Sequence, residues 1–305
     1  MSSFFFKIIG IPKFGEISLS LRTVLSLSLR LALFVIAAAL VYHLLWGRLF
    51  AWSPVKLGYK SLPFQRADII LPNDWSLPPE LQNADGIFAD CENFHGLRFN
   101  KHITIILAKT PEVARRCSGV RGAACAFQTG TVIFLSPTKI LANGRKLTDQ
   151  LKHECSHALL DQNTSLYCGF NIPEWFFEGL AIFYGNPHDN YTGNTFLELA
   201  VDRGYFFDVL GPYDTLKKVP EQYRYGFKHS EFRCFVEYLA AKYGIKTILA
   251  YAKDLIQDPW AERALFERHF NKKLETVADE FRKEVYARQW PSSTNEGNNG
   301  HRQAL

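Results

Sequence analysis

The sequence predicts an α+β fold in which a small mixed sheet is followed by a mainly helical half, preceded by one N-terminal transmembrane helix. A 23-residue apolar run lies near the N-terminus, two β-branched apolar runs lie between turn signals further on, and helical patterns fill the chain from Lys146 onward. Since 47% of the 305 residues are hydrophobic, the chain can bury a sizeable core.

The apolar run at residues 24–46, VLSLSLRLALFVIAAALVYHLLW, is long enough to cross a bilayer as a helix. Its one charged residue, Arg30, lies near the start of the run, where the side chain can reach the headgroups. The run is followed by GRLFAW instead of a small-residue cleavage site, which favours an uncleaved anchor and makes residues 1–23 an N-terminal tail. A buried core helix is the alternative interpretation.

The charges that flank this anchor do not orient it, because four Lys and Arg residues precede its apolar core or lie at its start and four follow it closely. A single N-terminal anchor commonly leaves its short tail in the cytoplasm. We therefore expect a single-pass membrane protein whose large domain lies on the extracytoplasmic side.

Composition divides the rest of the chain into three parts. Residues 47–80 are rich in Pro and turn residues and are predicted to be a linker, residues 81–290 are predicted to form the domain, and the polar residues 291–305 are predicted to be a disordered tail. The net charge of +5 is small and the basic residues are scattered, which argues against a nucleic-acid-binding protein.

Within the domain, a helix is expected from Leu81 to His95, and strands are expected at His102–Ala108 (HITIILA) and Thr131–Pro137 (TVIFLSP). The segment PEVARRC between them is predicted to be helical. From Lys146 the chain is expected to form successive helices, beginning with one that contains residues 151–160, LKHECSHALL. The two strands are predicted to share one sheet that packs on this helix.

The six cysteines all follow the anchor, and none lies in a C-x-x-C pair, which disfavours a zinc ribbon. Cys117 and Cys125 are the best candidates for a local disulfide in an exported domain. Alternatively they are ordinary small apolar residues, as we expect of Cys155 in its amphipathic helix.

The motif HECSH at residues 153–157 is the candidate metal-binding motif of the chain. On a helix, positions i and i+4 share one face, so the imidazoles of His153 and His157 can converge on one zinc ion. Glu154 lies about 100° around the helix from His153, beside the metal, where its carboxylate can take a proton from bound water. The pattern H-E-x-x-H arises by chance in roughly one or two such chains per hundred. The surrounding sequence must therefore decide whether this motif binds a metal.

A catalytic zinc site keeps three protein ligands and one open position, and this helix supplies two. Downstream, NIPEWFFEGLAIFYG offers Glu174 and Glu178. Glu178 is the stronger candidate, because an acid within FFEGLAIF is costly to bury unless it is paired or coordinated. Glu174 lies in the first helical turn, where the helix dipole alone explains an acid.

The segments HECSHALL, IPEW and EGLAIFYG together resemble the gluzincin branch of the zinc metallopeptidases, in particular membrane-associated peptidase-like domains with H-E-x-x-H-A-L and P-x-W-x-x-E-G-x-A. The resemblance covers roughly Ile87 to Leu255. It implies a zincin-like domain that binds Zn²⁺ through His153, His157 and Glu178, and that hydrolyses peptide bonds of a protein or peptide substrate with Glu154 as general base.

Many relatives in this branch have a tyrosine or histidine on a later segment that can hydrogen-bond the oxyanion, and the segment YRYGFKHSEFRCFVEYL offers Tyr223, Tyr225 and His229. All three stay open as candidates, since an aromatic or lone histidine often only packs. Asp161 follows His157 by four residues; because HALLDQ continues the helical pattern, we expect it to accept a hydrogen bond from a ligand imidazole, not to bind the metal itself.

The sequence leaves one alternative function open. The same domain could be a catalytically inactive, membrane-tethered binding module with a peptidase-like fold. The presence of His153, Glu154, His157 and Glu178 together favours the enzyme.

Overall fold

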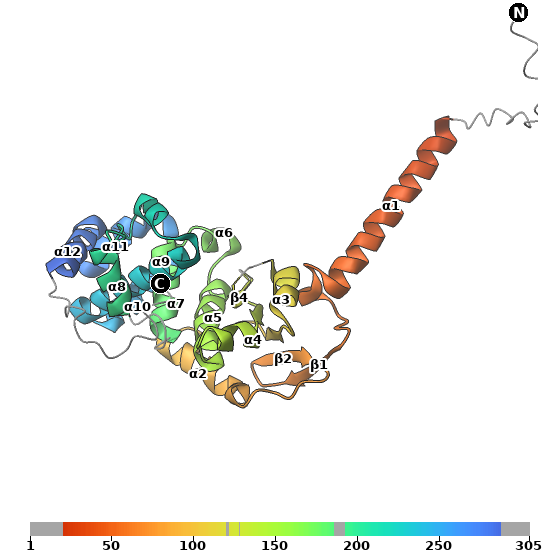
Figure 1. Cartoon of the computed structure of the whole chain (residues 1–305), viewed down its shortest axis with the longest axis horizontal. Helices are drawn as coiled ribbons and strands as arrows, with labels where there is room; N and C mark the ends of the chain where they lie inside the picture. The colour runs from red at the N-terminus through yellow and green to blue at the C-terminus, as the bar shows by residue number, and fades with distance from the viewer. Residues whose placement is uncertain (1–20, 120–121, 128, 186–192, 288–305) are drawn as a thin grey trace, which may run out of the picture. The chain divides into compact units, whose positions relative to one another are not determined.

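The computed structural model describes residues 21–119, 122–127, 129–185 and 193–287 (Figure 1). The chain divides into two compact units, Met1–Val55 and Lys56–Leu305. The predicted disordered tail at 291–305 lies outside the described residues, as do residues 1–20 of the predicted N-terminal tail.

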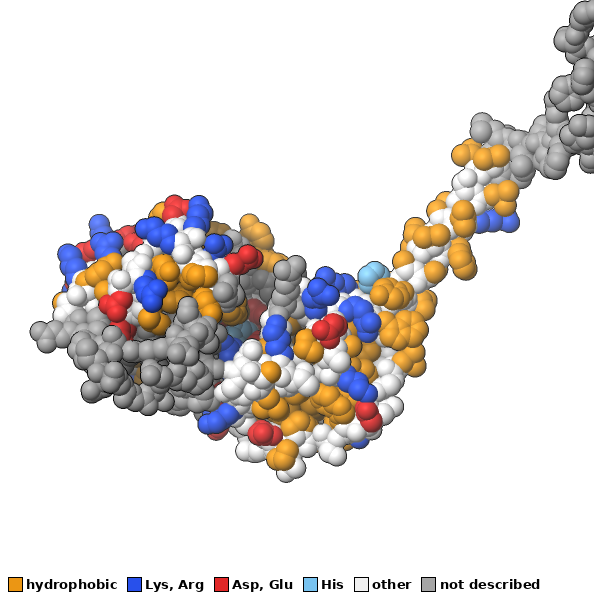
Figure 2. Space-filling view, in the orientation of Figure 1, with side chains coloured by type: hydrophobic (Ala, Val, Ile, Leu, Met, Phe, Trp, Pro, Cys, Tyr) orange, Lys and Arg blue, Asp and Glu red, His pale blue; other side chains and the backbone are white. Residues whose placement is uncertain are grey.

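The first unit consists of the long helix α1 (Leu21–Trp46) and the short 3₁₀ helix η1 (Phe50–Trp52). Residues Val24–Trp46 have a mean hydropathy of 2.4, and none of their most apolar window is buried. Figure 2 shows apolar side chains along this helix. Leaving such side chains in water is costly. The helix is long and apolar enough to cross a membrane.

The second unit contains a five-stranded sheet with the strand order β1-β2-β3-β5-β4. Its strands are β1 (Tyr59–Pro63), β2 (Ala67–Pro72), β3 (Ile103–Leu107), β4 (Ala124–Ala126) and β5 (Val132–Leu135). The three central strands run parallel, and each edge strand pairs antiparallel with its neighbour. This confirms the predicted small mixed sheet, with both predicted strands as neighbours within it.

The segment at 47–80, for which the sequence predicts a linker, contributes β1 and β2 to this sheet. Pro63 and Pro72, two of the prolines of this segment, each lie at the last position of a strand. A proline is tolerated at the end of a strand that forms or borders a sheet edge. The β2 residues are nearly all buried, so this strand belongs to the core.

The remaining elements of the second unit are helical. They are η2 (Pro79–Leu81), α2 (Ala84–His95), α3 (Pro111–Ser118), α4 (Pro137–Ala142), α5 (Leu147–Gln162), α6 (Leu166–Gly169), α7 (Glu174–Gly185), α8 (Gly193–Asp202), η3 (Tyr213–Lys218), α9 (Glu221–Tyr243), α10 (Ile245–Leu255), η4 (Pro259–Ala261), α11 (Glu262–Phe270) and α12 (Leu274–Ala287). The long helical patterns of the sequence are broken at Gly244 and Asn271, which both adopt a positive φ.

Two hydrophobic cores meet at α5. One core joins the sheet to α2 and α5 and includes Leu151 and Leu159. The other lies among α7 and the helices that follow it, and Leu160 of α5 packs into it. Because α5 is held from both sides, its orientation is fixed by the whole domain.

All six cysteines are free thiols. The candidate bridge between Cys117 and Cys125 is therefore not formed, and the alternative, that they are ordinary small apolar residues, holds. Cys117 is buried, and burial raises the pKa of the Cys125 thiol to about 12, which is the behaviour of a small packing residue.

Candidate metal centre and active site

The two motif histidines lie one turn apart on α5. Their Nε2 atoms are 3.1 Å apart, and the rings meet edge to face with centroids separated by 4.6 Å. His157 is 6% exposed. The i, i+4 spacing therefore brings both nitrogens to one point, as the sequence predicts.

Glu178 of α7 faces these two nitrogens. Its Oε2 lies 3.7 Å from Nε2 of His153 and 3.5 Å from Nε2 of His157. Two glycines of α7 allow this approach: a Cβ on Gly179 would come within 2.7 Å of the Phe232 carbonyl oxygen, and one on Gly185 within 3.1 Å of the Asp149 carbonyl oxygen. The sequence EGLAIFYG thus lets α7 pack closely against α9 and α5.

The three side chains fit a zinc ion. Their ligand atoms all lie within 4.8 Å of one another. Two atoms bound to tetrahedral zinc at about 2.0 Å are separated by about 3.3 Å, close to the distances found here. The buried Oε2 atom of Glu178 faces three imidazole nitrogens, at 3.7 Å from Nε2 of His153, 3.5 Å from that of His157 and 3.3 Å from that of His229. A buried anionic oxygen that converges with imidazole nitrogens is suited to a cation.

Electrostatics at this centre favour the charged forms of His157 and Glu178 and the neutral form of His153. Burial, with the neighbouring His157, lowers the pKa of His153 to about 3. Burial opposes charge on His157 too, but the Glu178 carboxylate outweighs it and raises the His157 pKa. Burial would raise the pKa of Glu178, yet His157 holds it well below its usual value. A metal ion would displace the proton from this imidazolium–carboxylate pair.

Glu154 lies beside the cluster and is 3% exposed. Burial raises its pKa to about 7. Its Oε1 accepts a hydrogen bond of 3.0 Å from Nε2 of Gln150, whose Oε1 in turn accepts one of 3.3 Å from Nη1 of Arg145. A carboxyl group whose pKa lies near neutral pH and whose position is fixed by a hydrogen bond has the properties of a general base.

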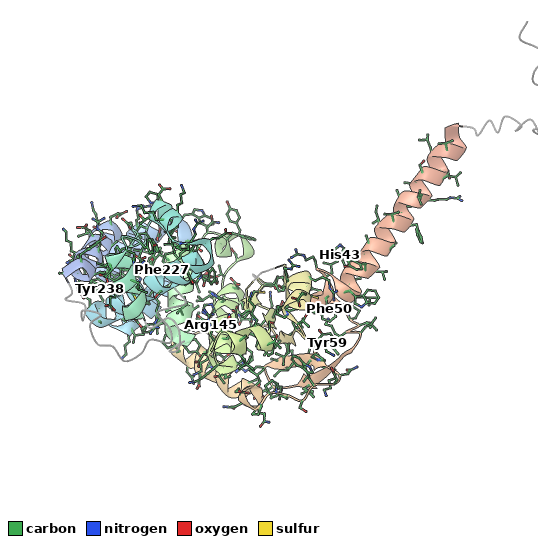
Figure 3. The ribbon with its side chains drawn as sticks, in the orientation of Figure 1. His43, Phe50, Tyr59, Arg145, Phe227 and Tyr238 are labelled. Atoms are coloured by element: carbon green, nitrogen blue, oxygen red, sulfur yellow. The ribbon has the colours of Figure 1, made fainter. Side chains whose placement is uncertain are left out.

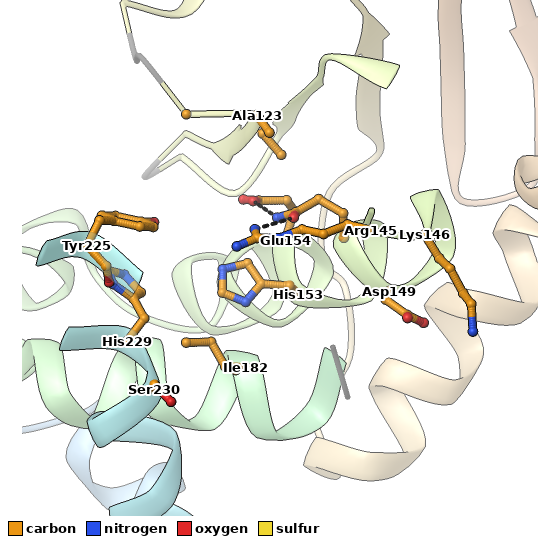
Figure 4. A pocket seen from close by; sticks show the side chains of 13 residues that line it. Ala123, Arg145, Lys146, Asp149, His153, Glu154, Ile182, Tyr225, His229 and Ser230 are labelled. Atoms are coloured by element: carbon orange, nitrogen blue, oxygen red, sulfur yellow. Dashed lines mark hydrogen bonds between the residues drawn. The ribbon is translucent and has the colours of Figure 1, made fainter. Parts of the chain in front are cut away.

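A pocket of about 90 Å³ opens onto His153 and Glu154 (Figure 4). Besides residues of α5, the lining comprises Gly122 to Ala124 at the edge strand β4, Arg145 and Lys146 before α5, Ile182 of α7, and Tyr225, His229 and Ser230 of α9. The pocket gives a ligand access to the candidate base and to one motif histidine.

Among the three oxyanion candidates, the structure brings two to this pocket. His229 is 8% exposed, and its Nε2 lies 3.3 Å from Oε2 of Glu178. Tyr225 lines the pocket with its ring against that of His229, at a centroid distance of 3.7 Å. Tyr223 instead lines a different, smaller hollow formed with Leu199 and Phe227, among others, and does not line the pocket beside His153.

Asp161 lies on the same helix as His157 and is 8% exposed. Burial raises its pKa to about 7. The Nδ1 atom of His157 has no hydrogen-bond partner among the described residues, so the expected bond to Asp161 is not formed here. The i, i+4 spacing keeps the carboxyl group near this nitrogen.

Two residues of the site were missed from the sequence. Gln150 precedes Glu154 by four residues, and this helical spacing could have identified it as a partner of the base. Arg145 lies in the turn before α5, where no periodic signal marks it.

No family model and no curated protein matches the sequence. Three similar solved structures are a variant of the M1 zinc metallopeptidase of Deinococcus radiodurans (TM-score 0.47, 11% identity, 78% of this chain and 54% of that one) and two-domain M1 zinc metallopeptidase variants bound to L-arginine (0.41, 13%, 76% and 52%) and to L-tryptophan (0.40, 12%, 78% and 54%). The chain thus spans about half the length of each. These similarities are too low to assign a family, and the chemistry rests on the site's own geometry.

Proposed function

We propose that this protein is a membrane-anchored, zinc-dependent metallopeptidase, a hydrolase that cleaves peptide bonds with Glu154 as its general base. The observation that carries the proposal is the convergence of His153, His157 and Glu178 beside a buried carboxyl group at the edge of a pocket. Three ligands and an accessible fourth position are the arrangement of catalytic zinc sites, whereas structural sites are closed by four protein ligands.

Zinc held by these three side chains would lower the pKa of a water molecule toward about 7 and polarise a substrate carbonyl. Glu154 is placed to accept a proton from the water that attacks the carbonyl carbon and to return it to the leaving amine. Its pKa of about 7 suits both transfers at neutral pH. Gln150 holds the carboxylate in position during them.

His229 is the residue we assign to the developing oxyanion. Its Nδ1 is 2.8 Å from the Tyr225 carbonyl oxygen, which fixes the ring so that Nε2 faces the Glu178 side of the centre. Tyr225 is 64% exposed and offers its ring as one wall of the pocket. Since the Tyr225 carbonyl takes the Nδ1 hydrogen, Nε2 donates only when the ring is an imidazolium, and that protonated form would stabilise charge that develops in the transition state.

We further propose that α1 anchors the chain in a membrane, with the domain on the extracytoplasmic side. The length and hydropathy of α1 support the anchor. A protease-protection assay on sealed right-side-out vesicles tests the side. Added protease should digest an extracytoplasmic domain, and a domain that stays protected in these vesicles would contradict the assignment.

The Glu154→Gln variant tests the catalytic proposal. It keeps shape and a hydrogen-bonding group but cannot accept the proton, so zinc content and folding should survive while peptide hydrolysis falls by several orders of magnitude. Glu174→Gln, a change on the exposed side of α7 where Glu174 pairs with Lys228, is the matched control and should retain both.

The inactive binding module is the competing outcome of the same experiment. It predicts that the wild-type protein binds zinc and peptides without cleaving them. Hydrolysis that persists unchanged in Glu154→Gln would show that the activity does not arise at this site.

A further inference from the structure

Three aromatic side chains gather on the surface of the second unit where α6 meets η4. Tyr167, Phe170 and Trp260 are 74%, 65% and 54% exposed. The rings of Tyr167 and Trp260 lie 5.1 Å apart between centroids, and Phe170 follows Tyr167 by three residues, the spacing of neighbours on one helix face. Side chains of α6 extend outward from the ribbon (Figure 3). We call these three residues the aromatic patch.

The backbone beneath the aromatic patch is fixed by hydrogen bonds. Nδ2 of Asn171 donates to the Tyr167 carbonyl oxygen at 2.8 Å. Nε2 of Gln257, just before η4, donates to the Asn163 carbonyl oxygen at 3.1 Å, and the Cys168 thiol of α6 donates to the Gln257 carbonyl oxygen at 3.8 Å. The segments that carry the patch are therefore joined to each other, and the rings are exposed on a defined surface.

The residues of the patch have the chemistry of a membrane interface. Trp and Tyr are enriched where hydrocarbon meets water, because each combines an apolar ring with a polar tip. Residues 163–173, NTSLYCGFNIP, include no charged side chain, so this segment can approach lipid without desolvating an ion. The charges nearest to Trp260 along the chain are Asp258, which is exposed, and Glu262, whose Oε1 accepts a hydrogen bond from Nε1 of Trp175 at 2.9 Å.

The size of the patch argues against a stable protein partner. At about 200 Å² for an aromatic side chain, the exposed fractions of the three rings amount to roughly 400 Å². A stable protein interface buries about 800 Å² on each partner. The other large hydrophobic side chains exposed on the described part of the second unit lie on other elements: Leu57, Leu141, Tyr225 and Tyr286. A patch of this size suits shallow contact with a surface to which the chain is already tethered.

The anchor proposed for α1 supplies such a surface. Helix α1 ends at Trp46 and the second unit begins at Lys56, and a chain of this length spans at most about 35 Å when fully extended. The second unit is therefore held beside the bilayer. Since contact with that bilayer is intramolecular in effect, a patch with low intrinsic affinity is sufficient.

We propose that the aromatic patch binds the interfacial region of the bilayer that holds α1, with its rings among the lipid headgroups. This inference rests on the proposed anchor and adds a second membrane contact to it. Because α6 follows α5 after only residues 163–165, the contact restricts how the helix that carries His153 and His157 is oriented relative to the bilayer.

Quenching of tryptophan fluorescence by brominated lipid tests this contact in the full-length protein. The protein is placed at one chain per nanodisc, either in palmitoyl-oleoyl phosphatidylcholine or in phosphatidylcholine brominated near the headgroup end of one acyl chain. The emission of a single tryptophan is the difference between the wild type and the variant that lacks it. Trp260→Phe isolates the patch, Trp46→Phe isolates the end of α1, and Trp175→Phe isolates a buried ring of the helical core.

We expect the emission of Trp260 to fall by about twofold or more in the brominated bilayer, as for an indole at the level of the headgroups. Trp46 should be quenched as well, whereas Trp175, which is buried, should emit equally in both lipids. Changing Tyr167→Ser together with Phe170→Ser should reduce the quenching of Trp260. Tyr286→Ser, which removes an exposed aromatic ring from α12, is the matched control and should leave this quenching unchanged. Melting temperatures confirm that each variant is folded.

Equal emission of Trp260 in the two lipids, with Trp46 quenched, would overturn the proposal and leave the anchor in place. Quenching of Trp260 that is unaffected by the paired serine changes would overturn it too. An unquenched Trp46 would instead reject the anchor proposed for α1, and the second contact with it. If Trp260 is unquenched at one chain per nanodisc and its emission shifts to shorter wavelength only when several chains share a disc, the patch binds a second copy and the membrane assignment is wrong.

Discussion

Nε2 of His229 lies 3.3 Å from the same Glu178 oxygen that faces both motif histidines, while Nδ1 of His229 is 2.8 Å from the Tyr225 carbonyl oxygen. A carbonyl oxygen only accepts, so Nδ1 carries the hydrogen. A neutral His229 therefore presents a lone pair to a carboxylate, whereas a protonated one donates to it. The ring thus borders the centre without being one of its three converging ligands.

Replacing His229 with glutamine should leave one zinc per chain and lower peptide turnover by about a hundredfold, the scale of a lost oxyanion donor. Zinc content by elemental analysis and turnover of the zinc-loaded protein are measured together. Loss of zinc in this variant would mean that His229 is a fourth ligand and that the site is closed.

Gln150→Met should retain zinc and fold normally, because methionine is a good helix former of similar length. It removes the amide that hydrogen-bonds Glu154, so the carboxylate is less well fixed. We expect turnover to fall by about 10- to 100-fold, as found for lost outer partners of metal-site residues. Unchanged turnover would show that Gln150 does not position the base.

Gly179→Ala should destabilise the domain by about 1–3 kcal/mol, since the added Cβ would lie 2.7 Å from the Phe232 carbonyl oxygen and force α7 and α9 apart. Thermal unfolding measures the loss. Gly169→Ala is the control: its Cβ would meet Oδ1 of Asp161 at 3.7 Å, an ordinary contact, and its melting temperature should stay near that of the wild type.

Glu92 predicts an acid-sensitive contribution to stability. Its side chain is 1% exposed, pairs with Arg66 and Arg98 at 2.9 Å each, and accepts the Phe99 N–H at 2.9 Å. Burial would raise its pKa, but these donors outweigh burial and hold the pKa below its ordinary value of 4.5. The folded state therefore gains stability above about pH 4.5 and loses it as the pH falls through the lowered pKa.

Glu92→Gln should accordingly be less stable than the wild type by about 2–4 kcal/mol at pH 7, because both arginines lose their partner. The difference should shrink as the pH falls from about 5 to 3. Denaturant unfolding at several pH values measures it. A constant difference across this range would contradict the assigned protonation of Glu92.

The geometry of the centre was accessible from the sequence because it depends on short-range spacing. The interval between His153 and His157 fixes a shared helix face, and the apolar neighbours of Glu178 require that its charge be compensated. Both arguments are local, and the structure brings these three side chains together. Whether they bind zinc stays a prediction.

Features set by tertiary pairing were less accessible. The strands β1 and β2 were not predicted because prolines at their ends indicated a linker, and β4, with three residues, is too short to show an alternating pattern. Tyr223 and His229 lie six residues apart on α9, yet only His229 lines the pocket, because the two positions face different sides of the helix. The hydrogen bond from Arg145 to Gln150 depends on the turn before α5, and sequence periodicity gives no signal for a turn.

Zinc retention in Glu178→Gln, compared with Asp161→Asn, tests whether His153, His157 and Glu178 are the metal ligands. Elemental analysis of the full-length proteins should find one zinc per chain in the wild type and in Asp161→Asn, and little in Glu178→Gln, which has lost an anionic ligand. If Asp161→Asn instead releases the metal and Glu178→Gln retains it, the third ligand is wrong and the proposed active site with it.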